Sequence, residues 1–198
     1  MSFLIRMELF KRYLVDLGSK IPLCIYVVLL LILFISTSII IRSKRISDKR
    51  RKIAGVLFIE YFTLLYCATV FIRDVADKQS FKTRPFWSYI VLYNGEKHPD
   101  VLLPQMIMNV VIFIPLGFLL GVAFRNTTWW ETVIVGGSAS ISIELIQLLT
   151  SRGTAEYDDV MHNTLGCLIG YGLYSMLRIG YEKVCKRNVE SLKIRKLE

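Results

Sequence analysis

The sequence has little that would build a soluble, disulfide-bonded or zinc-binding domain. Its four cysteines are scattered without a CxxC or Cys/His spacing, so neither a disulfide framework nor a zinc site is indicated. Charged residues make up only 21% of the chain, whereas 54% of its residues are hydrophobic and the mean hydropathy is +0.47. An ordinary soluble domain is less apolar than this. The composition therefore predicts an integral membrane protein.

A nucleic-acid interface is also not indicated, although the formal net charge is +9. The Lys and Arg residues collect in a few polar segments that flank apolar runs, a distribution that membrane topology and anionic lipid headgroups explain. Membrane lipids are therefore the expected partners, and neither nucleic acid nor a cofactor is expected. The first apolar run ends in STSIIIRSKR without a small-residue cleavage pattern, which predicts a retained helix and not a removable signal peptide.

Helical periodicity and apolar length predict an all-α fold, a polytopic transmembrane helical bundle. Residues 1–20 place apolar side chains at helical spacing between charged ones, which predicts an amphipathic helix lying in the membrane interface. Five later segments each have about the 20 apolar residues that a helix needs to cross the hydrocarbon core. These predicted spans are residues 22–41, 53–72, 104–123, 131–150 and 159–178.

The positions of the basic residues predict how this bundle is oriented. Placing residues 42–52 and the C-terminal tail in the cytoplasm leaves 15 of the 25 Lys and Arg residues on the inner side. The positive-inside rule then favours an external N-terminus and a cytoplasmic C-terminus. The predicted organisation is an N-terminal helix at 1–20, a first span with a basic cytoplasmic loop at 21–52, a transmembrane domain at 53–178 and a basic cytoplasmic tail at 179–198.

A short polar hinge between the last two predicted spans carries most of the unusual chemistry. Acid, amide and guanidinium groups fall within 20 residues of one another there: Glu144, Gln147, Arg152, Asp158, Asp159 and Asn163. Ionisable groups in or beside spans are costly and mark candidate functional sites. On the predicted topology the hinge lies at the external surface, together with Arg73 and with Asn109 in the second turn of the third span. Glu144 is then about 9 Å below the end of its helix.

The loop at residues 73–103 faces the same side and interleaves aromatic residues with Arg84 in the run KTRPFWSYIVLYNG. Aromatic residues favour the membrane interface, so the loop is expected to cap the helix ends. A sharper hypothesis makes Arg84 and the aromatic residues part of a pocket for a headgroup or a sugar.

Small residues recur on two of the predicted spans at helical spacing. Gly166 and Gly170 share one helix face with Asn163, and Gly117 and Gly121 share another with Asn109. Such small-residue faces let another backbone approach closely. A compact bundle in which these faces meet would bring Asn109, Asn163 and Glu144 together, although a dimer could use the same faces.

Three kinds of chemistry fit the hinge, and two structural explanations compete with them. Glu144 could act as a general acid or base while Arg152 holds an anionic phosphate. Glu144, Asp158, Asp159 and His162 could bind a divalent cation, but no spacing rule supports this, and no metal site is predicted. The cluster could also bind without reacting. Alternatively, the amides hold the bundle together, and one of the aspartates caps the fifth helix.

Four segments together resemble a known family. They are RPFWSY at 84–89, NVVIFIPLGFLL at 109–120, IELIQ at 143–147 and RGTAEYDDVMHNTLG at 152–166, and over roughly residues 53–178 they are similar to the VanZ-like family of bacterial membrane proteins. The residues that match the family pattern are Asn109, Pro115, Gly117, Glu144, Gln147, Arg152, Asp159, Asn163 and Gly166. The resemblance implies a polytopic plasma-membrane protein connected with glycopeptide (teicoplanin) resistance in the cell envelope. It implies no established biochemical activity.

Two functional hypotheses follow. In the first, an outward-facing polar pocket binds an amphiphilic lipid-linked glycan or lipid-tailed glycopeptide. If the protein also acts on this ligand, Glu144 and Asp159 take acid, base or cation roles and Arg152 recognises a phosphate or carboxylate. The residues expected to complete the binding site are Asn109, Gln147, Asn163, Asp158, Arg84 and Arg73. In the second hypothesis, the protein is a noncatalytic structural or adaptor protein whose polar cluster only stabilises the bundle.

Overall fold

The computed structural model describes residues 23–43, 46, 48–71, 80–82, 84–124, 126–152 and 154–195, and the helix predicted at residues 1–20 lies outside them. The elements in chain order are α2 (Leu23–Arg42), α3 (Lys49–Tyr66), the π-helix η1 (Cys67–Phe71), β1 (Ser80–Lys82), α4 (Trp87–Tyr93), α5 (Pro99–Ala123), α6 (Trp129–Thr150), β2 (Thr154–Glu156) and α7 (Tyr157–Arg195). The predicted all-α class is confirmed, with one short parallel pair of strands added at the hinge.

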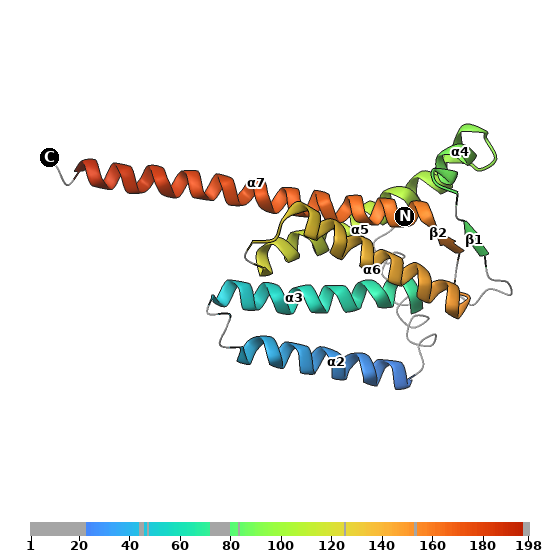
Figure 1. Ribbon diagram of the computed structural model, residues 1–198, viewed down its shortest axis with the longest axis horizontal. Helices are drawn as coiled ribbons and strands as arrows, with labels where there is room; N and C mark the ends of the chain where they lie inside the picture. Colours follow the sequence, from blue (N-terminus) through green and yellow to red (C-terminus); the bar gives the residue numbers. More distant parts are fainter. Residues whose placement is uncertain are drawn as a thin grey trace, which may run out of the picture.

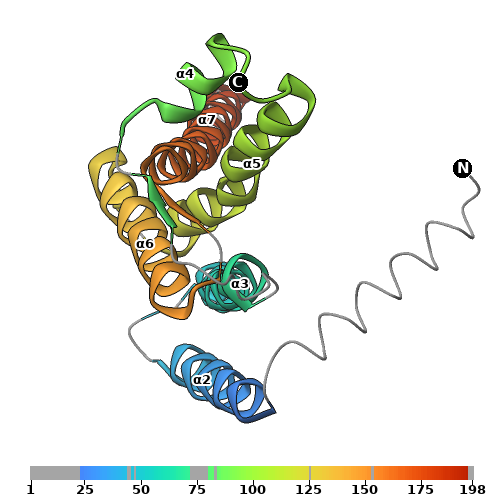
Figure 2. The ribbon, with the colours of Figure 1, turned by 90° about the vertical axis from the view of Figure 1, so that its right-hand side faces the viewer.

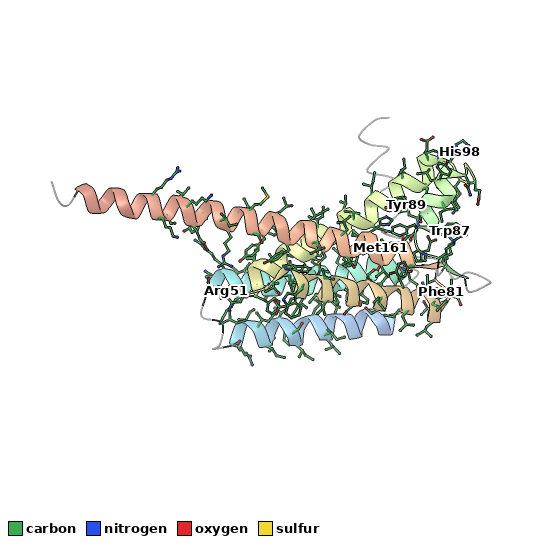
Figure 3. The ribbon with its side chains drawn as sticks, turned by 45° about the horizontal axis from the view of Figure 1, so that its top comes forward. Arg51, Phe81, Trp87, Tyr89, His98 and Met161 are labelled. Carbon is green, nitrogen blue, oxygen red and sulfur yellow. The ribbon has the colours of Figure 1, made fainter. Side chains whose placement is uncertain are left out.

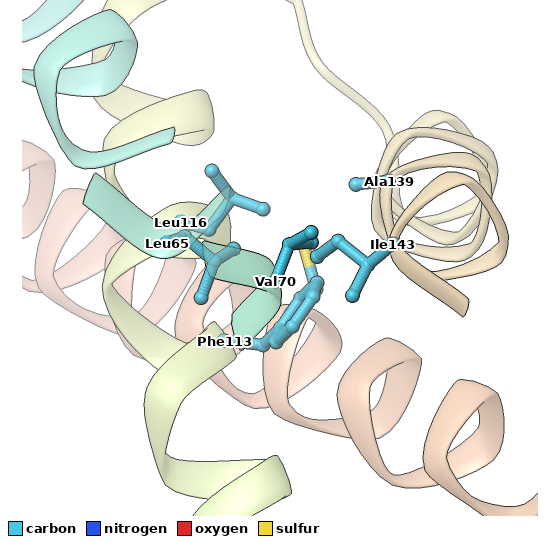
Figure 4. Close-up of a cluster of buried hydrophobic side chains, with 7 residues drawn as sticks. Leu65, Val70, Phe113, Leu116, Ala139 and Ile143 are labelled. Atoms are coloured by element: carbon cyan, nitrogen blue, oxygen red, sulfur yellow. The ribbon is translucent and has the colours of Figure 1, made fainter. Parts of the chain in front are cut away.

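The long helices run side by side as a bundle (Figure 1). α7 packs along α5, with α6 and α3 beside this pair, and α2 lies outermost against α3 (Figure 2). Side chains from four helices meet in the buried core shown in Figure 4, among them Leu65 of α3, Phe113 of α5, Ile143 of α6 and Cys167 of α7. The core therefore joins α3, α5, α6 and α7, and none of the α2 side chains that the structure describes belongs to it.

Among the described residues, three helices are long and apolar enough to cross a membrane, as predicted for these segments. They are Lys49–Val70, Pro99–Ala123 and Trp129–Thr150. In α2, where the side chains are described from Leu30 onward, the apolar stretch is shorter and covers Leu30–Arg42. α7 has 39 residues and is about 58 Å long, nearly twice the thickness of the hydrocarbon core. The fifth predicted span is thus the first half of one helix that continues through the basic tail.

Local sequence signals set the helix starts. α3 begins after Asp48, whose side chain accepts a hydrogen bond from the backbone N–H of Arg50 at 2.9 Å. α6 begins with a capping box in which Thr128 and Glu131 satisfy each other's backbone N–H groups. α5 starts with Pro99 at its first position, five residues earlier than predicted. Asn109 consequently lies about 15 Å along α5, in its third turn and not in its second.

Close packing of α5 on α7 depends on glycine, as the spacing predicted. A Cβ atom on Gly117 would lie 1.8 Å from the carbonyl oxygen of Cys167, and one on Gly166 would lie 2.0 Å from that of Val110. On Gly170 it would lie 1.9 Å from the carbonyl oxygen of Ile114. The two glycine faces therefore meet within one chain, and they bring Asn109 and Asn163 to within about one turn of the same helix crossing.

The two ends of the bundle differ in chemistry. The hinge, β1, β2 and α4 gather at one end, where Figure 3 shows Phe81, Trp87 and Tyr89. The turn between α2 and α3 lies at the other end, marked in Figure 3 by Arg51, and the C-terminal half of α7 projects past that same end (Figure 1). The two most basic segments therefore lie together, at the end of the bundle opposite the hinge.

Candidate functional site

A tight turn after α6 folds the hinge back over the bundle. α6 ends at Ser151, which adopts a left-handed conformation with φ 53°, and the backbone N–H of Arg152 then donates to the carbonyl of Gln147 at 2.9 Å. β2 follows at once, and α7 begins at Tyr157. This path places the first turns of α7 beside the last turns of α6.

Five of the polar residues predicted at the hinge are buried there. Glu144 is 7% exposed, and the others are 5% exposed or less: Gln147, Asp158, Asp159 and Asn163. Arg152 is half-buried in the turn itself. The structure therefore assembles the predicted hinge set at one end of the bundle.

Glu144 is tied to the hinge backbone. Its Oε2 accepts a hydrogen bond from the backbone N–H of Glu156 at 2.9 Å, so a carboxylate on α6 fixes the position of β2. A buried carboxylate is stabilised by such donors, because burial without a partner would cost several kcal/mol. The position of β2 in the hinge therefore depends on the carboxylate of Glu144.

The side-chain amides of the predicted site bond to neighbouring elements, and some of their polar atoms have no hydrogen-bond partner. Gln147 donates through Nε2 to the carbonyl of Thr69 in η1 at 2.8 Å, and Asn163 donates through Nδ2 to Ser140 Oγ at 2.8 Å. Within the described part of the chain, Gln147 Oε1, Asn163 Oδ1 and Asn109 Nδ2 are buried without a hydrogen-bond partner. Buried polar atoms are nearly always paired, so these three amides retain capacity for a polar guest.

The carboxylate of Asp158 accepts hydrogen bonds from the start of α4, across the hinge. Its Oδ1 accepts from the backbone N–H of Phe86 and its Oδ2 accepts from that of Ser88, both at 2.7 Å. Phe86 has φ 60°, which is unusual for a bulky residue and costs energy. Asp158 was predicted to bind ligand or to cap the helix after the hinge, and the structure shows that it holds the N-terminus of α4 in this strained conformation.

Replacing Asp158 with alanine should release α4 from the hinge. Two hydrogen bonds to a charged acceptor are lost, so we expect a local destabilisation of about 3 kcal/mol. Hydrogen exchange of the amides in Trp87–Tyr93 should become faster, whereas that of α5 and α6 should not change. Asp100→Ala removes an exposed aspartate from the first turn of α5 and is the matched control. Equal exchange rates in the two variants would show that Asp158 does not hold α4.

Two side-chain contacts at the hinge were not predicted from the sequence. Lys82 Nζ contacts Glu156 Oε1 at 2.6 Å across the register pair of β1 and β2, and it lies 3.9 Å from the centre of the Trp87 ring. Tyr89 Oη and His162 Nε2 share a hydrogen bond of 2.8 Å. Strands of three residues show no periodicity, so nothing predicted the first pair. The position of His162 could have been predicted, because it lies one turn after Asp158 on the same face of α7.

An apolar pocket of about 250 Å³ lies beside Glu144. Seven apolar or aromatic side chains line it: Phe81, Ile141, Leu145, Leu148, Ala155, Tyr157 and Val160. Glu144 and Glu156 also border it. A polar pocket was predicted here, but Glu144 turns its carboxylate toward the Glu156 amide, so the cavity itself is surrounded mainly by hydrocarbon.

Other predicted site residues are less closely joined to this pocket. Arg84 is exposed between β1 and α4, and Arg73 lies outside the described residues. Among the described residues, no three His, Cys, Asp or Glu side chains form a group that could hold a metal ion. Both carboxylate oxygens of Asp158, a ligand in the cation alternative, face backbone amides.

Comparison with known proteins identifies the family. The VanZ/LLP1 family model matches residues 21–178, which is most of the chain. The chain belongs to the VanZ/LLP1 family. The match includes α2 and ends with the part of α7 inside the bundle, so the projecting half of α7 lies beyond it. The three apolar helices and the family together indicate a membrane protein.

One curated protein is similar to part of this chain. Protein VanZ of Enterococcus faecium is 36% identical over 72 residues, which is 36% of this chain and 45% of that protein. The aligned part thus spans less than half of the relative's length. No solved structure matches this VanZ/LLP1 chain.

Proposed function

We propose that this VanZ/LLP1 protein is a multi-pass protein of the bacterial plasma membrane that binds an amphiphilic molecule of the cell envelope at its hinge. The hinge faces outward and the C-terminus is cytoplasmic. The separation of the hinge from the two basic segments, which lie at opposite ends of the bundle, supports this orientation. The ligand is a lipid-linked glycan or a lipid-tailed glycopeptide.

The observation that carries the proposal is the position of Glu144. Its carboxylate lies at the boundary between an apolar pocket on one side and a buried polar cluster on the other. An amphiphile needs both environments at one place. A site that only stabilised the bundle would not require a cavity beside Glu144, the group whose burial costs the most free energy.

Each hinge residue has a role in this proposal. Arg152 recognises a phosphate or carboxylate of the ligand, as a guanidinium does well. The unused amide atoms of Asn109, Gln147 and Asn163 orient its polar groups. If the bound molecule is also processed, Glu144 and Asp159 supply the acid and base.

Arg84 and Arg73 belong to the outer part of the same proposed site. Both come from the loop that β1 attaches to the hinge, and in this proposal they contact the headgroup at the membrane surface. Family membership also supports a contribution of the protein to teicoplanin resistance, through capture of a lipid-tailed glycopeptide before it reaches its target.

The alternative is a noncatalytic structural or adaptor protein. The bonds of Asp158 to α4 and of Gln147 to η1 favour it, because both hold elements of the protein together. These bonds leave the pocket unexplained, however, and they do not use the remaining oxygen of Gln147.

A cysteine at Tyr157 tests both sidedness and binding. Tyr157 is 49% exposed and is the first residue of α7, at the hinge end of the pocket, so in Tyr157→Cys a membrane-impermeant maleimide should react from outside intact cells. Added teicoplanin should slow this reaction. Arg51→Cys, at the opposite end of the bundle, should react only after permeabilisation, and the parent protein gives the background of the native cysteines.

Two results would contradict the proposal. Labelling of Tyr157→Cys only after permeabilisation would reverse the topology. Labelling from outside at a rate that neither teicoplanin nor a lipid-linked glycan changes would leave the hinge exposed but without the proposed ligand.

A further inference from the structure

The pocket beside Glu144 opens toward the lipid-facing side of α6. The residues Ile134, Ile141, Leu145 and Leu149 recur at helical spacing along this helix and are 55%, 57%, 52% and 70% exposed. Two of them, Ile141 and Leu145, also border the pocket. In a bilayer this stripe contacts hydrocarbon, so the mouth of the pocket faces acyl chains and not bulk water.

On the proposed orientation, the pocket extends from the hinge into the outer half of the bilayer. Leu148, Leu145 and Ile141 are two, five and nine residues before the end of α6 at Thr150, which corresponds to depths of about 3, 8 and 14 Å. The pocket therefore runs along α6, from just below the hinge toward the middle of the bundle.

The lining of the pocket excludes a polar occupant. A buried water needs two to four polar partners. The nearest carboxylate, that of Glu144, accepts the Glu156 amide at 2.9 Å, and the carboxylate of Glu156 contacts Lys82 at 2.6 Å. Apolar cavities of about 150 Å³ suffice to hold benzene, and this one is larger, at about 250 Å³.

We infer that the pocket binds one alkyl chain of an amphiphile, which enters sideways from the outer leaflet while its polar end stays at the hinge. This inference rests on the proposed function and narrows its ligand class, because recognition then requires a free hydrocarbon chain. A membrane phospholipid and a lipid-tailed envelope molecule share this chemistry. The glycan or peptide portion is recognised elsewhere, above the pocket.

Photo-crosslinking in proteoliposomes tests the inference. The full-length protein is reconstituted with a phospholipid that carries a diazirine in one acyl chain, and the labelled residues are mapped by mass spectrometry. Leu145→Trp places an indole at the mouth of the pocket. Leu149→Trp makes the same change one turn away on the same lipid-facing stripe, outside the pocket lining, and is the matched control.

The expected result is crosslinking concentrated on Ala155, Tyr157 and Val160 in the wild type and in Leu149→Trp. Leu145→Trp should reduce it about tenfold, since excluding even two methylene groups has this effect on binding. Equal labelling of Leu145→Trp and wild type, or labelling spread evenly over the exposed apolar residues, would overturn the inference, because the chains would then be ordinary boundary lipid.

Competition separates the two sources of the chain. A lipid-tailed glycopeptide that displaces the probe, when the same glycopeptide without its tail does not, identifies the tail as the preferred occupant. If neither displaces the probe, a phospholipid chain is the occupant. In that case the pocket still binds a chain, but the proposed capture of a lipid-tailed glycopeptide fails, so the two proposals are distinguished.

Discussion

Gly170→Ala should destabilise the protein by about 3 kcal/mol or more, at the upper end of the usual cost of overpacking. The new methyl group would lie 1.9 Å from the carbonyl oxygen of Ile114 and 2.8 Å from the backbone nitrogen of Phe118. Both contacts are to backbone atoms of α5, which no side-chain rotation can relieve. The helices must move apart along the crossing that positions Asn109 and Asn163. Thermal unfolding in detergent, followed by tryptophan fluorescence, measures the loss.

Gly172→Ala is the control, two residues further along the same helix. A Cβ atom there meets nothing within 4 Å, so alanine should leave stability unchanged or raise it by about 0.5 to 1 kcal/mol through helix propensity. If Gly170→Ala and Gly172→Ala unfolded at the same temperature, α5 and α7 would not be in the close contact described.

The glycine pairing also shows how far sequence alone could go. Spacings of four placed Gly117 and Gly121 on one face and Gly166 and Gly170 on another, and helical geometry required those faces to be packing surfaces. The spacing could not decide between a partner within the chain and a second copy. Backbone approach between α5 and α7 decides this, and it depends on all the connections between the helices.

The sequence predicted which polar residues gather at the hinge, but it did not predict the contacts that build the hinge. Ionisable groups beside spans identified Glu144, Arg152 and Asp159 as candidates, because their burial is costly wherever they point. The pairing of β1 with β2 involves three residues on each strand, too few for a period-2 pattern. The left-handed Phe86 depends on Asp158, which is 72 residues away in the sequence, so no local signal could reveal it.

Hydropathy located the spans better than it located the ends of the helices. α7 continues past residue 178 because helix formation does not require an apolar sequence, and Arg178 and Glu182 form an ion pair one turn apart there. Similarly, η1 extends α3 with a π-helical segment, and Gln147 bonds to a carbonyl within it. Segments of this kind occur frequently at functional sites, but hydropathy does not reveal them.

Glu144→Gln should abolish function and leave the fold intact. Glutamine has the same shape and can still accept the Glu156 N–H through its amide oxygen, so the free energy of unfolding should change by only about 1 kcal/mol. What disappears is the negative charge at the boundary between the pocket and the polar cluster. A hydrogen bond to a charged group contributes about 1.5 to 3 kcal/mol, so ligand affinity should fall about tenfold to a hundredfold.

Two measurements made in parallel separate these effects. Thermal unfolding reports on the fold, and the teicoplanin susceptibility of cells that express the protein reports on function. Glu182→Gln, on the exposed part of α7, is the control for a lost carboxylate and should alter neither. If Glu144→Gln unfolded the protein and cells with residual folded protein kept full resistance, the polar cluster would be structural.

Native mass spectrometry of the protein, ejected directly from membrane nanodiscs, tests the central claim that the hinge end holds an envelope amphiphile. We predict that wild-type protein carries one bound molecule with the mass of a lipid-linked or lipid-tailed compound. Glu144→Gln should carry about tenfold less of it or none, while Glu182→Gln should retain it. The same bound mass at the same occupancy in wild type and Glu144→Gln, or a wild-type protein that carries no bound amphiphile, would contradict this account.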